Sequence, residues 1–442
     1  MLRNLSLLRR GRRLFSADVL KELQWRGAVH QTTGDDTVRE LLQQPTAFYA
    51  GFDPTAPSLH VGNLLVMITM LRLAKGGLNP VALLGGATGM IGDPSFRDTE
   101  RVLMSDDQVV HNKRRIESQI RAFFQRNGTE VQVVDNLEWY SDMTSLEWLR
   151  DIAMHMRVPT MLARDSVAAR MRAESGARLS LGELCYQALQ AHDFVRLYKT
   201  REVQLQLGGS DQWGNIIAGI DLARRNGESE EEDKLHGLTV PLLTTSSGEK
   251  FGKSAGNAIF LDSSPFAIYQ YFRSQPDADI PRLLRLFTFL DQERIEELET
   301  ELAENAETGQ VQSLLAAEVT RLVCGDEGVE AAQAGTAALF GRGKLSALDA
   351  PTLRDVLRGV TSTTVSKDKL EQGELSLSEA LVSAGLAPSK KQANKAIANG
   401  SIYLNDDRVS EATLRLSSEH LLADTCVVLR SGKKRRAVLH VE

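Results

Sequence analysis

Short apolar runs alternate with longer segments of helical periodicity over residues 46–243 of this chain. We expect strands at 46–52, 80–84, 131–134 and 203–207, each leading into a polar turn, and a last strand at 238–243. Helical patterns lie between them at 64–75, 106–127, 146–156 and 181–197. Strands that alternate with helices predict an α/β fold in which a parallel sheet is covered on both faces. Ligands of such a sheet bind beyond the carboxyl ends of its strands.

The rest of the chain changes in character. Residues 265–340 are Ala-, Leu- and Glu-rich with few β-branched residues, and we expect them to be mainly helical. Residues 341–374 are rich in Gly, Ser and Thr, which predicts a linker. After it, two short helices at 377–384 and 389–398 and a hairpin over 400–409 predict a small α+β unit. The predicted domains are therefore 16–264, 265–340 and 375–442, with the linker at 341–374.

Composition fits a chain of two or three domains with a sizeable core. The 442 residues contain no apolar run near the ~20 residues of a membrane span, so we expect no membrane partner. Cys185, Cys324 and Cys426 are few, odd in number and far apart, which predicts buried or inert thiols in a reducing compartment. The net charge is −6, but both ends of the chain are basic and the middle is acidic. This division suits a small-molecule enzyme with a separate nucleic-acid contact.

The amino terminus has its own composition. The first 17 residues contain five arginines and no acidic residue, with leucines available for one apolar helical face. That pattern is typical of a mitochondrial transit peptide and not of a secretory signal, which needs an unbroken apolar stretch. Arg13-Leu14-Phe15-Ser16 resembles a matrix-processing site, with cleavage after Phe15. We predict a transit peptide at 1–15 and the mitochondrial matrix as destination; the alternative is a basic arm that touches RNA.

A first candidate nucleotide loop follows the first strand. His60 stands where a helix should begin, and a helix start offers free N–H groups and a partial positive charge to phosphate. His60 and Asn63 can donate hydrogen bonds to phosphate or ribose, and Gly62 would let a flat ring approach the backbone. Asp53 and Thr55 flank this loop. Taken alone, the motif also fits a capped helix start with one surface histidine.

A second candidate loop is Lys-Phe-Gly-Lys-Ser at 250–254. Lys250 and Lys253 can close over a triphosphate, because lysine is a compact, mobile charge suited to a group whose negative charge moves as pyrophosphate leaves. Ser254 follows them. An exposed basic loop is the alternative for this segment alone, and the pairing with the first loop favours an active site.

Together these motifs resemble those of class I aminoacyl-tRNA synthetases. His-Val-Gly-Asn at 60–63 is similar to the His-Ile-Gly-His signature, and residues 250–254 are similar to the Lys-Met-Ser-Lys-Ser loop in the form typical of bacterial and organellar tyrosyl-tRNA synthetases. Residues 49–55, 85–94 and 208–215 also resemble that family, in the same order. The resemblance covers nearly the whole chain after the presequence. It implies a Rossmann-like catalytic domain, a helical anticodon-side domain and a homodimer.

The residues between the two loops narrow the substrate. Tyr186, Gln190 and Asp193 are four and three residues apart, so they form one polar stripe on a helix, which by itself is most often a wet face. The resemblance implies that Tyr49 and Asp193 hold the phenolic hydroxyl of tyrosine. It further implies that Asp93, Tyr186 and Gln190 hold the ammonium group. Gln212 and Asp211 would reach the carboxylate region and the ribose, and Gly51 and Asp53 would serve the adenylate.

The implied activity is that of a tyrosine–tRNA ligase acting on tyrosine, ATP and tRNA(Tyr). The tyrosine carboxylate is already a nucleophile, so it can attack the α-phosphate of ATP without a protein base. Catalysis should therefore come from positioning and charge stabilisation. The candidate residues for this are His60, Asn63, Thr55, Lys250, Lys253 and Ser254. We expect Mg²⁺ to accompany ATP and see no dedicated protein metal site.

The last unit resembles a small RNA-binding domain named for a ribosomal protein of the small subunit. Lys390, Lys391 and Lys395 would form a basic face for tRNA phosphates. Two other functions fit parts of the pattern. A tryptophanyl synthetase shares the two loops but has no reason to carry the pair Tyr49 and Asp193. An RNA-binding protein with an inactive synthetase core would not need intact loops.

Overall fold

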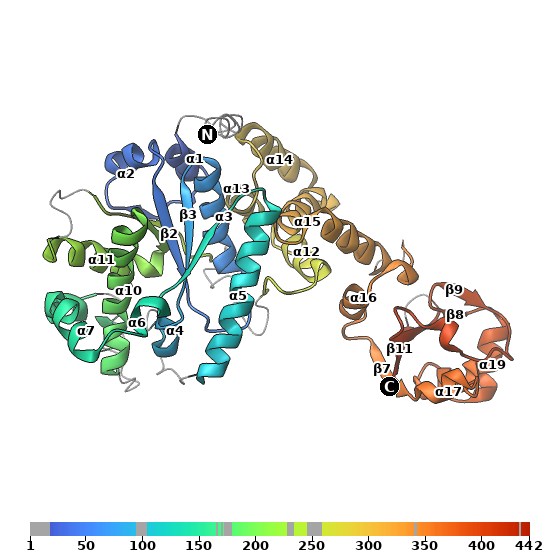
Figure 1. Cartoon of the computed structure of the whole chain (residues 1–442). Coiled ribbons are helices and arrows are strands. Elements are labelled where there is room, and N and C mark those ends of the chain that lie inside the picture. The colour runs from blue at the N-terminus through green and yellow to red at the C-terminus, as the bar shows by residue number, and fades with distance from the viewer. Residues whose placement is uncertain are drawn as a thin grey trace, which may run out of the picture. The chain divides into compact units, whose positions relative to one another are not determined.

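The computed structural model describes residues 18–93, 104–164, 167–168, 171, 179–227, 234–244, 259–339, 343–432 and 435–442. The chain divides into two compact units, one of residues 1–262 and 276–311 and the other of residues 263–275 and 312–442 (Figure 1). The helices predicted over 265–340 are present, but they are shared between the two units.

The first unit is built on a six-stranded sheet. Its strands are β1 (Gln31–Thr32), β2 (Ala47–Phe52), β3 (Asn79–Leu84), β4 (Gln132–Asp135), β5 (Val203–Gly209) and β6 (His236–Val240). Its helices are α1 (Val19–Trp25), α2 (Asp35–Leu42), α3 (Val61–Lys75), α4 (Thr88–Ile91), α5 (Asp106–Arg126), α6 (Leu137–Tyr140), α7 (Ser145–Asp151), α8 (Val158–Leu162), α10 (Leu181–Arg201), α11 (Trp213–Arg225), α13 (Ile280–Phe287) and α14 (Gln292–Asn305).

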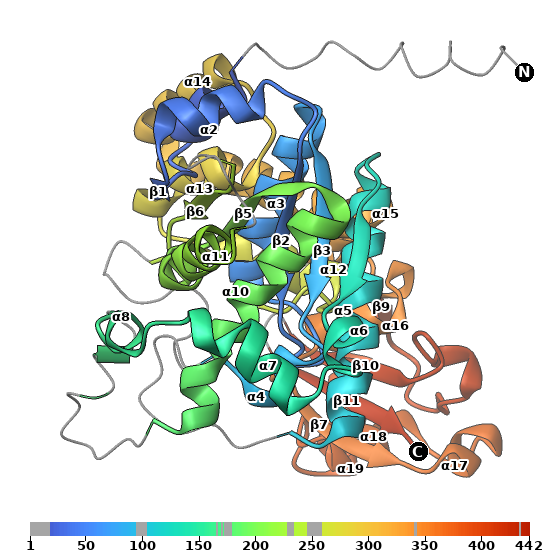
Figure 2. The same cartoon turned by 60° about the vertical axis from the view of Figure 1, so that its left-hand side comes forward.

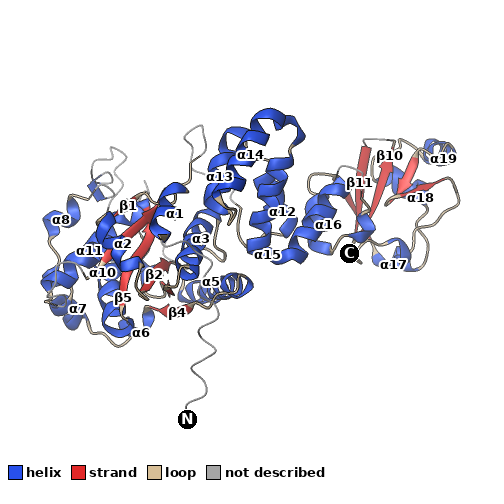
Figure 3. Ribbon diagram, turned by 90° about the horizontal axis from the view of Figure 1, so that it is seen from above, coloured by secondary structure: helices blue, strands red, loops and turns tan. Residues whose placement is uncertain are grey.

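Strand order in this sheet is β1-β6-β5-β2-β3-β4, and β2 to β6 pair in parallel. The predicted parallel α/β sheet is thus confirmed, with α10 and α11 on one face and α3 and α5 on the other (Figure 3). Chain order reverses between β2 and β5, which lie side by side in Figure 2. That switch point is where such sheets bind ligands, outside the carboxyl ends of the strands.

Local sequence signals explain where the helices around this point begin. The Ser180 hydroxyl accepts a hydrogen bond from the Glu183 amide, and the Glu183 carboxylate accepts one from the Ser180 amide, which starts α10 with a capping box. Ser105 and Gln108 start α5 in the same way. Near the end of α3 the buried guanidinium of Arg72 donates to the carbonyls of Arg285, Leu286 and Thr288, which fixes the end of α13 against α3.

Two features of this sheet differ from the sequence prediction. β1 was not expected, and it pairs antiparallel with β6, so the sheet is mixed. The last strand covers His236–Val240 instead of 238–243.

The second unit contains α12 (Pro265–Arg273), α15 (Gln310–Leu339), α16 (Ala350–Val356), α17 (Lys367–Glu371), α18 (Leu377–Ser383) and α19 (Lys390–Ala398). Its sheet has the order β7-β11-β10-β8-β9, formed by β7 (Thr361–Val365), β8 (Ile402–Leu404), β9 (Asp407–Val409), β10 (Cys426–Ser431) and β11 (Arg435–Val441). One side of this sheet packs on α18 and α19. The other side packs on α16 and the end of α15.

The predicted helices and hairpin of the last unit are present at nearly the expected residues. The segment expected to be a linker, 341–374, differs from that expectation, because it contains α16, β7 and α17. β7 completes the sheet by pairing in parallel with β11. A composition rich in Gly, Ser and Thr therefore marked a short edge strand and its turns, because threonines also favour strands.

Candidate functional site

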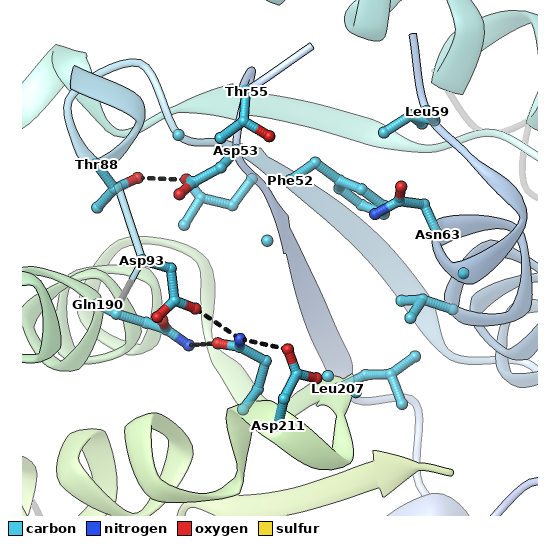
Figure 4. A pocket seen from close by; sticks show the side chains of 18 of the residues that line it. Phe52, Asp53, Thr55, Leu59, Asn63, Thr88, Asp93, Gln190, Leu207 and Asp211 are labelled. Atoms are coloured by element: carbon cyan, nitrogen blue, oxygen red, sulfur yellow. Dashed lines mark hydrogen bonds between the residues drawn. The ribbon is translucent and has the colours of Figure 1, made fainter. Parts of the chain in front are cut away.

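A cavity of about 340 Å³ opens at the switch point between β2 and β5. Twelve of the residues predicted from the sequence line it: Tyr49, Gly51, Asp53, Thr55, His60, Asn63, Asp93, Tyr186, Gln190, Asp193, Asp211 and Gln212. They come from the ends of β2 and β5, the start of α3, the turn after α4, and α10. Figure 4 shows several of them around the cavity. The structure thus brings these residues together, and their individual roles stay predictions.

The inner end of the cavity holds two buried polar side chains. Tyr49 on β2 is 1% exposed, and its hydroxyl has no hydrogen-bond partner among the described residues. Burial, and then the charge of Asp193, raise the pKa of Tyr49 well above its usual value, so the hydroxyl keeps its proton. Its ring packs on Phe194 with the centroids 5.4 Å apart. A buried hydroxyl that lines a cavity and lacks a partner is suited to a polar ligand atom.

Asp193 on α10 is the second of these side chains and is 2% exposed. Its two carboxylate oxygens accept hydrogen bonds from Asn136 Nδ2 at 3.0 Å and Trp139 Nε1 at 2.9 Å. Burial raises the pKa of Asp193 to about 7, although hydrogen bonds from Asn136, Trp139 and Tyr140 oppose that rise. The carboxylate is therefore held in place while its charge stays poorly solvated, so an added donor from a ligand would be favourable.

Asn136 and Trp139 were not predicted from the sequence. Both follow β4, and the signal that the sequence offers is the polar pair Asp135-Asn136 at the end of a strand. The Asn136 side chain also contacts the start of α4, because its Nδ2 donates to Thr88 Oγ1 and its Oδ1 accepts from the Ala87 amide. These two residues position Asp193 and do not themselves line the cavity.

The middle of the cavity is organised around Asp53. Its carboxylate accepts hydrogen bonds from Thr88 Oγ1 at 2.8 Å and from the Tyr186 hydroxyl at 2.9 Å. Burial, and then the charge of Asp53, raise the pKa of Tyr186 well above its usual value. A Cβ on Gly85 would lie 1.9 Å from Asp53 Oδ1, so glycine at that position makes room for the carboxylate. Tyr186 thus donates its proton within the protein and has oxygen lone pairs left for a ligand cation.

Gln212 joins the polar groups on the opposite wall. Its Nε2 donates to Asp93 Oδ2 at 2.7 Å and to Asp211 Oδ2 at 3.2 Å (Figure 4). Its Oε1 accepts from Gln190 Nε2 at 3.2 Å and from Asn215 Nδ2 at 3.2 Å. Asp93, Gln190 and Gln212 therefore form one connected network with a carboxylate at its end, an arrangement suited to an ammonium group.

The first nucleotide loop begins α3 as predicted. His60 is the N-cap: its Nδ1 accepts from the Gly62 amide at 3.0 Å, and its own amide donates to Asn63 Oδ1 at 3.1 Å. A Cβ on Gly62 would lie 2.8 Å from His60 Cε1. Glycine is thus needed there for the histidine ring, a reason that the sequence did not reveal. Because Nδ1 accepts a hydrogen bond, Nε2 carries the proton of a neutral imidazole and can donate it.

Two predicted features lie outside the described residues, namely the transit peptide and the loop of Lys250, Lys253 and Ser254. In the described part of the chain, no group of three or more His, Cys, Asp or Glu could hold a metal ion. Within the same residues, no helix has the length and apolar character to cross a membrane. Cys426 is buried, and Cys185 and Cys324 are half-buried.

The three predicted tRNA-binding lysines, Lys390, Lys391 and Lys395, lie on α19 and are exposed. Lys390 Nζ lies 2.6 Å from Glu379 Oε1 and holds the pKa of that carboxyl at about 2. This pairing reduces the net positive charge at that end of the helix. In the neighbouring hairpin, Asn405 takes the left-handed backbone conformation with a φ of 54°, which asparagine tolerates.

Comparisons with known proteins give one consistent result. The family of class I tRNA synthetases (W and Y) matches residues 41–341, and the tyrosine–tRNA ligase SYY-like C-terminal domain matches residues 353–439. The tyrosine–tRNA ligase of Bacillus caldotenax is 43% identical over 424 residues, which are 95% of this chain and 98% of the relative. The tyrosine–tRNA ligase of Lactococcus lactis subsp. cremoris is 42% identical over 428 residues, which are 96% of this chain and 99% of the relative.

A solved structure agrees with these relatives. A C-terminally truncated mitochondrial tyrosyl-tRNA synthetase from Aspergillus nidulans superposes with a TM-score of 0.65 at 32% identity and covers 73% of this chain and 94% of its own. The motifs, the fold and these matches extend over both units. The chain therefore belongs to the tyrosyl-tRNA synthetases, the tyrosine–tRNA ligases of class I.

Proposed function

We propose that this chain activates tyrosine with ATP and transfers it to tRNA(Tyr) in the mitochondrial matrix, with the tyrosine phenol at the inner end of the cavity. The observation that carries this placement is the pair of buried polar groups there. The Tyr49 hydroxyl lacks a partner among the described residues, and the Asp193 carboxylate is fixed by two donors. The phenol would donate to Asp193 and accept from Tyr49. Phenylalanine would leave both groups unpaired, a discrimination for which a tyrosyl-tRNA synthetase is itself the standard example.

The amino end of the substrate then lies toward the network of Gln212. Asp93 supplies the negative charge for the ammonium group, and the oxygens of Gln190 and the Tyr186 hydroxyl supply further acceptors. Because the Tyr186 hydroxyl donates its proton to Asp53, its lone pairs would remain available to the ammonium group. The substrate carboxylate would lie beside Gln212, at the outer part of the site.

ATP would occupy the part of the cavity formed by the start of α3 and the ends of β2 and β5. His60, Asn63 and Thr55 would contact phosphate oxygens, while Gly51, Asp53 and Asp211 would contact the adenosine part. Lys250, Lys253 and Ser254 would complete the phosphate site. Mg²⁺ would enter with ATP as part of the substrate, because aspartates of the cavity already accept internal hydrogen bonds.

The chemistry needs no covalent enzyme intermediate. The tyrosine carboxylate attacks the α-phosphorus of ATP, an oxygen–phosphorus bond forms, and the bond to pyrophosphate breaks. A terminal ribose hydroxyl of the tRNA then attacks the tyrosyl carbonyl, and AMP leaves. Donors aimed at the phosphate oxygens stabilise the charge that builds up in the first step. The His60 imidazole is preorganised for this, since its Nδ1 bond to the Gly62 amide fixes the ring.

Charging of tRNA(Tyr) with tyrosine tests this function. The full chain without residues 1–15, incubated with ATP, Mg²⁺, tyrosine and transcribed mitochondrial tRNA(Tyr), should form tyrosyl-tRNA. Absence of tyrosyl-tRNA, when the protein is folded and still exchanges pyrophosphate, would contradict the transfer step. Absence of both reactions would contradict the proposed function as a whole.

The basic face of α19 is proposed to bind tRNA. Changing Lys390, Lys391 and Lys395 together to alanine should raise the KM for tRNA(Tyr) by roughly tenfold, because three phosphate contacts are lost. Tyrosine-dependent pyrophosphate exchange, which needs no tRNA, should stay unchanged. The matched control changes Lys367 and Lys369, which are exposed on α17 of the same unit. Equal tRNA KM values for the two variants would remove α19 from the tRNA site.

The mitochondrial location is supported by the arginine-rich residues 1–17. A fluorescent protein fused after residue 17 should be imported into mitochondria, and a fusion with the arginines changed to glutamine should stay outside. Import of both fusions, or of neither, would argue against a targeting role.

The homodimer is supported by large apolar side chains that are exposed in the first unit. Leu146 on α7, Met154 after it and Leu181 at the start of α10 are 77%, 75% and 76% exposed. Isolated side chains of this kind are common, but several within one stretch of a domain favour a protein contact. Analytical ultracentrifugation at micromolar concentration should find the mass of two chains, and a monomer at that concentration would contradict this proposal.

A further inference from the structure

A buried asparagine lies behind the wall of the cavity that carries Gln190 and Gln212. Asn215 is in the first turn of α11, is 5% exposed and does not line the cavity. Its Nδ2 donates one hydrogen bond to Gln190 Oε1 at 3.0 Å and another to Gln212 Oε1 at 3.2 Å. One amide group thus binds the oxygens of both glutamines, although they belong to α10 and to the short turn before α11. Asn215 was not among the site residues predicted from the sequence.

Two carboxylates set the direction of the hydrogen bonds in this group of amides. An ionised carboxylate only accepts hydrogen bonds, so Gln212 must turn its Nε2 toward Asp93 and Asp211, at 2.7 and 3.2 Å (Figure 4). Gln212 Oε1 is then left to accept from Gln190 Nε2 and Asn215 Nδ2. Turning the Asn215 amide over would set its Oδ1 against the oxygens of both glutamines. Each amide of the group therefore has one favourable orientation.

The far end of this chain of amides is Gln187, which shows what the fixed orientation costs. It lies three residues before Gln190, on the same side of α10, and is 5% exposed. Its Nε2 donates to Asn215 Oδ1 at a long 3.5 Å, and its Oε1 has no hydrogen-bond partner among the residues that the structure describes. A buried acceptor without a partner costs free energy. Because Gln187 does not line the cavity, this cost falls away from the substrate site.

We propose that Asn215 is a positioning residue for the ammonium group of the substrate and that it acts by fixing Gln190 Oε1. The oxygen accepts one hydrogen bond from Asn215 and keeps a second lone pair for the ammonium group. Without Asn215, only the bond from Gln190 Nε2 to Gln212 would hold this side chain among the described residues. Gln212 would keep its orientation, because Asp93 and Asp211 still accept from it. This inference rests on the proposed tyrosine activation and adds a residue that does not touch the substrate.

Two small ligands separate the ammonium end of the site from the rest of it. Tyramine has the phenol and the ammonium group of tyrosine but no carboxylate. 3-(4-Hydroxyphenyl)propionate has the phenol and the carboxylate but no ammonium group. Each should compete with tyrosine in pyrophosphate exchange, which gives an inhibition constant for each ligand. Loss of a fixed acceptor at Gln190 should weaken only tyramine, whereas a distorted cavity would weaken both ligands.

The test compares two asparagines of one helix. Asn215→Leu nearly keeps the size of the side chain and removes its amide. Asn226→Leu makes the same change at the other end of α11, where Asn226 is the C-cap and does not line the cavity. Asn215→Leu should raise the inhibition constant of tyramine and the KM for tyrosine by roughly tenfold, because the ammonium group loses a fixed acceptor. The inhibition constant of 3-(4-hydroxyphenyl)propionate and the KM for ATP should stay unchanged.

All values of Asn226→Leu should match the unchanged protein. An equal rise of both inhibition constants in Asn215→Leu would mean that Asn215 only shapes the wall of the cavity and would overturn the proposal. An unchanged inhibition constant of tyramine would overturn it too, as would the same shift in Asn226→Leu. Should Asn215→Leu not fold, Asn215→Ala is measured in its place. An unchanged protein that shows no tyrosine-dependent exchange would instead contradict the proposed function.

Discussion

Replacing Asp193 with asparagine should lower kcat/KM for tyrosine by about 100-fold in pyrophosphate exchange, with little change in the KM for ATP. A hydrogen bond to a charged group contributes about 1.5–3 kcal/mol, and the asparagine removes that charge while keeping the shape. Its new amide would also point a donor toward Asn136 or Trp139, which already donate to this position. Steady-state kinetics at several tyrosine concentrations measure the effect. An unchanged kcat/KM for tyrosine in this variant would exclude Asp193 as the acceptor of the phenol hydrogen bond.

The pH dependence of tyrosine binding gives an independent control. The pKa of Asp193 is raised to about 7, so the ionised acceptor form is lost as the pH falls through 7. The apparent Kd for tyrosine should therefore rise about tenfold between pH 8 and pH 6, because the ionised fraction falls by that factor. In Asp193→Asn this dependence should be absent, which equilibrium dialysis can measure. A dependence that persists in the variant would have to come from another group.

Replacing Lys253 with alanine should lower kcat for pyrophosphate exchange by more than 100-fold and leave the KM for tyrosine nearly unchanged. A preorganised charge that meets the developing charge of the transition state contributes about 3 kcal/mol of activation free energy. The KM for tyrosine should stay because the proposed phosphate site is away from the proposed phenol site. Stopped-flow measurement of adenylate formation at saturating ATP separates this step from product release.

Lys344→Ala is the matched control for that variant, since Lys344 is an exposed lysine of the second unit. It should leave the rate of adenylate formation unchanged. If Lys253→Ala forms the adenylate at the unchanged rate, the lysine has no part in the chemical step and the similarity of residues 250–254 to a catalytic loop carries no function here.

Local signals made much of the first unit predictable. Strands and helices were recognised from their periodicity, and α5 and α10 begin where Ser105 and Ser180 supply capping boxes. The cavity was predictable because the carboxyl ends of parallel strands meet at one edge, which gathers residues as distant in the chain as Asp53 and Asp211. For the strands and the helix starts, the information lies within a few residues of the position concerned, and the parallel order of the strands then gathers the site.

Tertiary contacts account for what was missed. β1 is two residues long, and its pairing with β6 joins positions about 200 residues apart. The donors Asn136 and Trp139 reach Asp193 only because β4 and α10 are brought together by the fold. No local pattern reveals such contacts.

Pyrophosphate exchange with single amino acids tests most directly whether the inner end of the cavity selects tyrosine. The chain without residues 1–15 is assayed with ATP, Mg²⁺ and, in turn, tyrosine, phenylalanine and tryptophan. Exchange should depend on tyrosine and be far weaker with phenylalanine, which lacks the hydroxyl that Tyr49 and Asp193 would bind. Exchange driven by tryptophan, or equally by phenylalanine, would contradict the assignment of that pair to the phenol.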